Sequence, residues 1–165
     1  MIVDERLVTY INSLDTGNTE ILDQIEKEAI AAYVPIIRKE MQSFLKLLLA
    51  MQKPMRILEV GTAVGFSAIL MAQYAPADCK IVTIENYEKR IPVAKENFKR
   101  AGKDEQITLL EGDAMQILPT LSGEFDMIFM DAAKGQYINF MPDILRLLKS
   151  GGVLVSDNVL QDGDI

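Results

Sequence analysis

From Pro54 onward the sequence alternates between short apolar runs and longer amphipathic segments. Each run has the length of one buried strand, and the segments between the runs carry apolar residues at the spacing of a helix face. A chain that repeats strand and helix in this way forms a parallel sheet with helices on both faces and right-handed crossovers. We therefore predict an α/β fold, a doubly wound parallel sheet that binds ligands at the carboxyl ends of its strands. The predicted strands are 57–60, 81–84, 107–110, 125–130 and 153–156, and the predicted helices are 66–75, 87–101, 114–121 and 136–149.

The first 53 residues show helical periodicity and no strand-like run. Two helices are expected here from apolar stripes, and either Asn18 or Thr19 is suited to cap the second. A third helix is expected to begin at Pro35, because proline suits the first turn of a helix. We therefore divide a single domain into an N-terminal helical segment, 1–53, and a sheet-containing core, 54–165. The two stripes are Leu7, Tyr10, Ile11 and Leu14, then Ile21, Leu22, Ile25 and Ala29.

Composition narrows the possible chemistry. The 165 residues contain no histidine and one cysteine, Cys79, which excludes a Ser-His-Asp triad, an imidazole zinc site and an internal disulfide. Any general base must then be Asp, Glu, Lys, Tyr or a thiolate. The net charge of -7 disfavours non-specific binding to nucleic acid phosphates. No apolar run approaches the roughly 20 residues of a membrane helix, and the acidic start is unlike a signal peptide, so we expect a cytoplasmic protein without membrane partners.

A glycine-containing turn, in LEVGTAVGFSA, follows the first predicted strand. Gly61 and Gly65 permit a tight turn and close backbone approach to a ligand at the start of a helix. Glu85 ends the second strand 24 positions after Gly61, where an acid can accept both ribose hydroxyls of an adenosine ligand. Asp113 follows the third strand, near the expected adenine ring, and serves equally well as a helix cap. The alternatives are glycines that serve turn geometry alone and a Glu85 that only stabilises a helix start.

Carboxylates also end the fourth and fifth predicted strands, at Asp131 and Asp157, and Asn158 follows. If these strands pair, their tips lie about 4.8 Å apart and the three side chains converge. Two adjacent carboxylates repel each other unless a cation lies between them, and all-oxygen ligation suits Mg²⁺. Lys134 follows Asp131 by three residues, and a nearby cation would lower the pKa of its amine, which makes it a candidate base. The alternatives are two helix-capping acids, a solvated lysine and, for Tyr137, a packing role.

Four segments, ILEVGTAVGFSA, VTIE, MDAAKGQY and VSDNVL, carry a resemblance to a known family. They resemble the metal-dependent class I O-methyltransferases, which include catechol and caffeoyl-CoA O-methyltransferases, over about residues 30 to 160. The resemblance implies a Rossmann-like fold that binds S-adenosylmethionine (SAM) and a divalent cation, Mg²⁺ or another. It implies Asp131, Asp157 and Asn158 as metal ligands and Lys134 as base, with Asp131 also among the catalytic and cofactor-binding residues. The other implied cofactor contacts are Val34, Glu59, Gly61, Thr62, Ser67, Glu85, Asp113 and Ala114.

The segment AAYVPIIRKEMQSFL is most similar to a bacterial subgroup that methylates 5-hydroxyuridine in the tRNA anticodon loop. This implies a tRNA substrate converted to 5-methoxyuridine, with a basic patch formed by Arg38, Lys39, Lys53 and Arg56, or an ordinary solvated surface at those positions. The alternative substrates are a small catechol-like phenol and a hydroxycinnamoyl compound. Alternatives of another class are an inactive SAM-binding module and an NAD-dependent enzyme, the latter weakened by Ala63 where a dinucleotide motif has glycine.

The resemblance also bears on the sheet edge and on assembly. The family fold continues through two strands that this sequence lacks, so we expect a sheet without its last two strands. An uncovered sheet edge and apolar N-terminal helices favour a homodimer.

Overall fold

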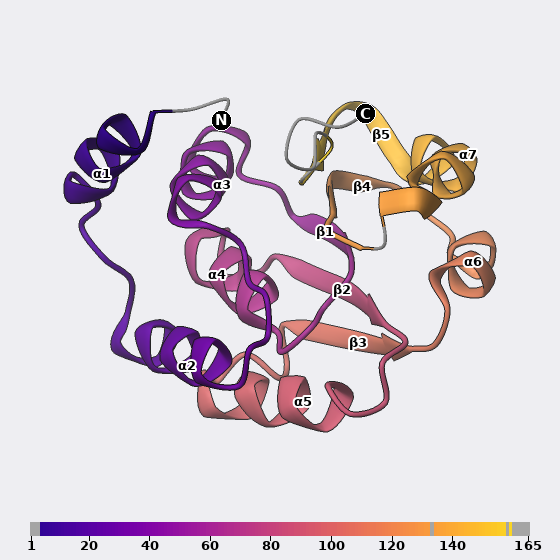
Figure 1. Cartoon of the computed structure of the whole chain (residues 1–165). Coiled ribbons are helices and arrows are strands. Elements are labelled where there is room, and N and C mark those ends of the chain that lie inside the picture. The colour runs from indigo at the N-terminus through magenta and orange to yellow at the C-terminus, as the bar shows by residue number, and fades with distance from the viewer. Residues whose placement is uncertain (1–3, 133, 158, 160–165) are drawn as a thin grey trace.

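The predicted strands form one parallel sheet. The computed structural model describes residues 4–132, 134–157 and 159 (Figure 1). The strands are hydrogen-bonded in the order β3-β2-β1-β4-β5. Strand order therefore reverses between β1 and β4, which makes the carboxyl ends of these strands the expected place for a ligand. The strands are β1 (Arg56–Val60), β2 (Lys80–Glu85), β3 (Ile107–Glu111), β4 (Phe125–Met130) and β5 (Leu148–Ser156).

Helices cover both faces of the sheet, as predicted (Figure 1). On one face α4 and α5 pack against the strands, with α2 and α3 outside α4, and on the other face lie α6 and α7. α1 contacts α3 and buries none of its own residues. Within the part of the chain described, no helix is both long and apolar enough to cross a membrane. The helices are α1 (Glu5–Ser13), α2 (Glu20–Ala31), α3 (Lys39–Gln52), α4 (Phe66–Tyr74), α5 (Ile91–Arg100), α6 (Ala114–Ile117), η1 (Leu118–Thr120), η2 (Lys134–Gln136) and α7 (Tyr137–Leu147).

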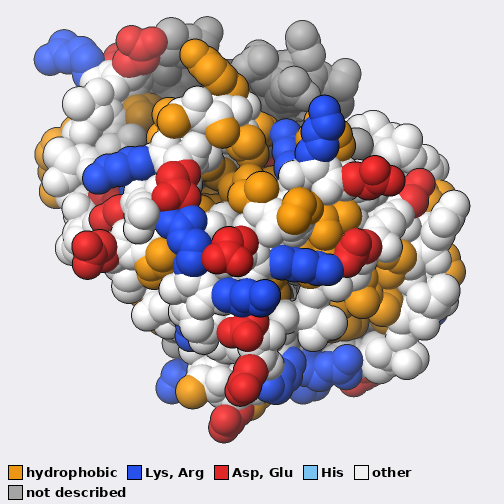
Figure 2. Space-filling view, turned by 90° about the horizontal axis from the view of Figure 1, so that it is seen from below, with side chains coloured by type: hydrophobic (Ala, Val, Ile, Leu, Met, Phe, Trp, Pro, Cys, Tyr) orange, Lys and Arg blue, Asp and Glu red, His pale blue; other side chains and the backbone are white. Residues whose placement is uncertain are grey.

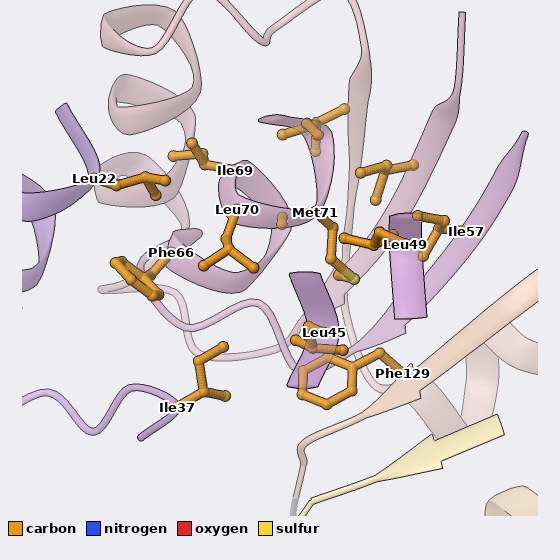
Figure 3. Close-up of a cluster of buried hydrophobic side chains, with 14 of the residues drawn as sticks. Leu22, Ile37, Leu45, Leu49, Ile57, Phe66, Ile69, Leu70, Met71 and Phe129 are labelled. Atoms are coloured by element: carbon orange, nitrogen blue, oxygen red, sulfur yellow. The ribbon is translucent and has the colours of Figure 1, made fainter. Parts of the chain in front are cut away.

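The larger hydrophobic core lies between the sheet and helices α2 to α5 (Figure 3). α4 is buried almost throughout because α2, α3 and α5 pack around it in addition to the sheet. Side chains alternate along β1, so that Ile57 belongs to this core while Leu58 belongs to the second core beneath α7. Because alternate residues of a strand share a face, Glu59 points toward α4.

The predicted start of the third helix at Pro35 is wrong, because α3 begins at Lys39. Residues 34–38 are instead non-helical, and Arg38 caps α3 from an extended conformation. This path lets Ile37 reach the core, and the Gln42 side chain donates a hydrogen bond to the Ile37 carbonyl at 3.0 Å. Tertiary packing thus overrides the preference of proline for a helix start.

Three other boundaries differ clearly from the predictions. The helix predicted over 87–101 begins at Ile91. The helix predicted over 114–121 is a short α6 followed by η1, because Pro119 has no N–H with which to continue an α-helix. β5 begins at Leu148, well before the predicted 153, and its register against β4 shifts between Phe125 and Met127. Thr19 is the N-cap residue of α2, although its hydroxyl makes no capping hydrogen bond.

Candidate functional site

A cleft of about 2260 Å³ lies at the carboxyl ends of the strands. Its walls include residues of α1 and the segment 34–41. The volume exceeds the roughly 300–1,000 Å³ of a typical small-molecule pocket, so the cleft has room for two ligands. Glu59 does not border the cleft, and both Asn158 and the side chain of Lys134 lie outside what the structure describes. The predicted site residues that line it are Val34, Gly61, Thr62, Ser67, Glu85, Asp113, Ala114, Asp131 and Asp157.

The glycine turn brings the ends of β1 and β4 into direct backbone contact. Gly61 has φ +104, and a Cβ added there would lie 2.2 Å from the Asp131 carbonyl oxygen. Gly65, with φ +84, is the N-cap residue of α4, and a Cβ there would lie 2.5 Å from the Phe98 ring. Both glycines are therefore required by the close approach of neighbouring groups as well as by their positive φ angles.

Glu59 lies beneath the turn and is completely buried. Its two carboxyl oxygens are each 2.5 Å from a hydroxyl, that of Ser67 on α4 and that of Thr83 on β2. Thr83 also shares a hydrogen bond of 2.5 Å with the Thr62 hydroxyl. Burial raises the pKa of Glu59 to about 8, although the Ser67 and Thr83 hydrogen bonds oppose the rise. The raised pKa favours the protonated acid at neutral pH, and its hydrogen bonds with Ser67 and Thr83 tie the turn to α4 and β2.

Glu85, at the end of β2, holds the other side of the turn. Its Oε2 accepts a hydrogen bond from the Ala63 N–H at 2.7 Å, and its Oε1 accepts from the N–H groups of Asn86 and Tyr87. A carboxylate offers about four lone-pair sites, so capacity remains for a ligand hydroxyl. The predicted role as a ribose acceptor stays a prediction, and Glu85 already organises the backbone around that position.

Asp113 performs the capping role that the sequence left open. Its Oδ1 accepts a hydrogen bond from the Met115 N–H at 2.9 Å, which caps α6. Asp113 and Ala114 also line the cleft beside Glu85, so capping and contact with an adenine ring are compatible.

β4 and β5 pair, as the metal-site prediction requires. Met130 and Ser156 are register partners, so Asp131 and Asp157, which follow them, lie at adjacent strand tips. The Asp131 N–H donates to the Val60 carbonyl and the Asp157 N–H donates to the Met130 carbonyl, both at 2.9 Å. These bonds fix the main chain at both tips.

The donor set at these tips fits a hard divalent cation, which prefers carboxylate and amide oxygens. Among the described residues, no group of three or more Cys, Asp or Glu side chains could hold a metal ion. The two aspartates therefore need a further ligand of another kind, and the predicted one, Asn158, lies outside the described residues. Lys134 begins η2, three residues after Asp131.

Tyr137 lies between these strand tips from the start of α7. Its hydroxyl is 3.0 Å from the Met130 carbonyl oxygen and 3.2 Å from that of Asp157. Burial, followed by the negative charge of Asp131, raises the pKa of Tyr137 to about 12. The phenol is therefore a hydrogen-bond donor at neutral pH and does more than fill space.

The sequence alone does not single out Thr83, and it favours a packing role for Tyr137. Thr83 stands inside an apolar run, and only the register that places it opposite Glu59 shows its role. A hydroxyl within a buried strand is the one signal that could have found it, because buried polar groups need partners. For Tyr137 the sequence offers no comparable signal, since its acceptors are backbone carbonyls.

Comparison with known proteins shows extensive similarity. The family described as O-methyltransferase matches residues 12–165. A catechol O-methyltransferase from Niastella koreensis is 40% identical over 126 residues, covering 74% of this chain and 57% of that protein. A catechol O-methyltransferase from Mycobacterium tuberculosis is 35% identical over 159 residues, covering 94% of this chain and 72% of that protein. The chain thus spans between about half and three quarters of the length of such relatives.

Solved structures share the fold. The O-methyltransferase TomG from Streptomyces achromogenes, involved in tomaymycin synthesis and solved in complex with SAM, superimposes with a TM-score of 0.87 at 31% identity. That superposition covers 99% of this chain and 77% of TomG.

Proposed function

The chain belongs to the O-methyltransferase family, and we propose that it uses SAM and a divalent cation to methylate one hydroxyl of a small aromatic substrate with two neighbouring oxygens. The observation that carries this proposal is the meeting of the glycine turn with the tips of β4 and β5. It puts a candidate cofactor turn at Gly61 in backbone contact with Asp131 and next to Asp157.

We propose that SAM lies across the ends of β1, β2 and β3. The turn at Gly61 and Gly65 leaves room for a ligand against the backbone, and Glu85 lies where ribose hydroxyls would be accepted. Ser67 lines the cleft and is held from below by Glu59. Support also comes from TomG, which has the same fold and was solved with SAM bound.

Asp131, Asp157 and Asn158 would hold the cation. When bound, it would lower the pKa of a substrate hydroxyl and orient its neighbouring oxygen. Lys134 would accept the hydroxyl proton, because the chain has no histidine and this lysine follows Asp131 by three residues. The substrate oxygen would then form its bond to the methyl carbon of SAM as the bond from that carbon to sulfur breaks. The products are the methyl ether and S-adenosylhomocysteine, with the proton on Lys134.

The charge of the cleft favours a small neutral or cationic phenol. Acids outnumber bases among its lining residues, and one of the bases, Lys39, is paired with Glu26 at 2.7 Å. Relatives named as catechol O-methyltransferases agree with a substrate of this class. The acids are Glu5, Glu26, Glu40, Glu85, Asp113, Asp131 and Asp157, and the bases are Arg38, Lys39 and Arg90.

5-Hydroxyuridine in tRNA is the alternative substrate, because its hydroxyl and carbonyl oxygens are also neighbours. The basic residues suggested by the sequence do not form one surface beside the cleft. Arg38 and Lys39 line it, but Lys53 precedes β1 and Arg56 is the first residue of β1, at the amino ends of the strands, where Arg56 lies over the Phe125 ring. On the face shown in Figure 2, basic and acidic side chains are interspersed. A tRNA substrate would thus rest on contacts to the base and few phosphates.

The test compares kcat/KM for a panel of catechols with kcat/KM for tRNA that contains 5-hydroxyuridine, with Mg²⁺ and with excess chelator. The kcat/KM for catechols should exceed that for the tRNA by orders of magnitude, and excess chelator should abolish turnover. Asp157→Ala should lose the cation-dependent activity and keep SAM affinity, whereas Asp143→Ala, on the outer side of α7, should keep both. A higher kcat/KM for the tRNA would contradict the proposal of a small phenolic substrate. Full activity in excess chelator would contradict the proposal that catalysis depends on a cation. SAM binding without transfer to any substrate would indicate an inactive SAM-binding module.

We also propose a homodimer. α1 exposes large apolar side chains, among them Leu7, Tyr10 and Leu14, and α3 exposes Phe44, Leu47 and Met51. Apolar surface of this extent is typical of an interaction face. Sedimentation velocity should show a dimer that Met51→Glu weakens, and a monomer at micromolar concentration would contradict the proposal.

A further inference from the structure

We propose that Tyr137 is a positioning residue for the metal site, whose hydroxyl holds the tips of β4 and β5 at the separation that one shared cation requires. The inference rests on the proposed function, because it concerns the two carboxylates assigned there to the cation. Tyr137 touches neither carboxylate through these bonds and acts through the main chain that carries them.

The hydroxyl sits where the ladder between the two strands ends. The last register pair is Met130 with Ser156, and one more backbone bond follows, from the Asp157 N–H to the Met130 carbonyl. The Tyr137 hydroxyl reaches that same Met130 carbonyl at 3.0 Å and the Asp157 carbonyl at 3.2 Å. The single phenolic proton is shared between these two acceptors, so the hydroxyl adds a bifurcated side-chain link between the strands at the position where the backbone ladder stops.

A link is useful there because two carboxylates on adjacent strand ends carry like charges, and repulsion between them opposes the spacing that one shared cation requires. A bond at the end of the ladder limits how far the tips can move apart before a cation binds. A group that fixes the ligand backbone beforehand raises metal affinity, as partners of ligating residues commonly do.

The ring and the hydroxyl of Tyr137 have separable roles. The ring packs against the core cluster that includes Met130 and Phe140, and phenylalanine would preserve this packing. Only the hydroxyl makes the two carbonyl contacts. Tyr137→Phe therefore removes the link while leaving the fold of α7 and the core in place.

The experiment titrates the purified protein with Mn²⁺ alone and follows free ion by electron paramagnetic resonance. Tyr137→Phe should raise the Kd for Mn²⁺ by about 10- to 100-fold. The affinity for SAM, measured by calorimetry, should change less than about twofold, because the glycine turn is held by Glu59 and Glu85. Tyr74→Phe is the matched control, since it removes the same hydroxyl from α4 outside the cleft. Hydrogen exchange at the Asp157 amide should quicken in Tyr137→Phe and not in Tyr74→Phe.

Equal Mn²⁺ affinity of Tyr137→Phe and the wild type would overturn the inference. Parallel losses of Mn²⁺ and SAM affinity, with unchanged exchange at Asp157, would overturn it as well, because they would indicate a general structural role. Failure of the proposed function looks different: the wild type would then bind Mn²⁺ no more tightly than Asp157→Ala does.

Discussion

Glu59 and Thr83 lie opposite each other across the β1–β2 pair, and the Thr83 hydroxyl is 2.5 Å from the Glu59 carboxyl group. Both side chains are completely buried. A strand pair in the centre of a parallel sheet would ordinarily carry apolar residues at these positions. The polar pair instead joins β2 to the turn, through Thr62, and to α4, through Ser67. Because a buried network stabilises only when each member is satisfied, both residues offer direct tests.

Glu59→Gln should change how stability depends on pH. The folded protein keeps the Glu59 proton up to a pKa of about 8, whereas the unfolded chain releases it near the ordinary glutamate pKa of 4.5. Between these values the folded state binds more protons, so the wild type loses stability as pH rises through this window. Glutamine imitates the neutral acid and does not titrate. The free energy of unfolding of the variant should therefore rise relative to that of the wild type by on the order of a few kcal/mol between pH 4.5 and 8.

Urea denaturation of both proteins without SAM, at half-unit steps from pH 5 to 9, measures this difference. Other groups titrate equally in the two proteins and cancel. Parallel stability curves would show that Glu59 is already ionised in the folded state.

Thr83→Val should weaken SAM binding. Valine keeps the shape of threonine but leaves the Glu59 carboxyl and the Thr62 hydroxyl without a shared partner. We expect a loss of about 1–3 kcal/mol of stability and a rise of about tenfold in the SAM Kd measured by calorimetry. Thr83→Ser should restore both values. Thr108→Val is the matched control, because Thr108 is exposed on β3. Equal effects of the two substitutions on stability and SAM affinity would contradict a specific role of Thr83 in supporting the cofactor turn.

Gly61→Ala should abolish SAM binding or prevent folding. The new methyl group would lie 2.2 Å from the Asp131 carbonyl oxygen, which forces the tips of β1 and β4 apart. Gly102→Ala is the control, because Gly102 also has a positive φ, +61, but has no atom within 4 Å of an added Cβ. Gly102→Ala carries only the cost of the left-handed conformation, about 1–2 kcal/mol, so any larger loss at Gly61 reports the contact together with the less favourable φ of +104 there. A Gly61→Ala protein with wild-type Tm and SAM affinity would disprove this account.

Lys134→Ala should lower kcat by about 10²- to 10⁴-fold, the usual contribution of a general base. The loss should shrink for catechols with acidic hydroxyls, which ionise without help. Lys149→Ala, which removes a lysine paired with Asp126, should leave kcat unchanged. Steady-state kinetics across catechols of graded pKa provide the measurement, and a loss independent of substrate pKa would argue against proton transfer to Lys134.

The sequence predicted the sheet, the helices on both faces and the meeting of strand ends, because short apolar runs between amphipathic segments have few other ways to pack. It failed where tertiary contacts decide the outcome. Pro35 does not begin α3, since the burial of Ile37 keeps residues 34–38 non-helical. The cofactor contact expected for Glu59 stays a prediction, and what the sequence did not show is that strand alternation turns this side chain toward α4, beneath the cleft. The Thr83 and Tyr137 hydroxyls depend on strand register and on backbone acceptors, which local sequence patterns do not reveal.

The contact between Gly61 and the Asp131 carbonyl involves main-chain atoms, whereas side chains shape the outer part of the cleft. In the proposed function, the separation of methyl donor and acceptor would depend on main-chain atoms at the ends of β1 and β4, which meet in this contact and in the bond from the Asp131 N–H to the Val60 carbonyl. Side chains on α1 and on the segment 34–41 shape the outer cleft without taking part in this contact. If the proposed function holds, peripheral side chains can change to fit new substrates without altering the main-chain contact between the strand ends, so selectivity and rate would depend on different parts of the molecule.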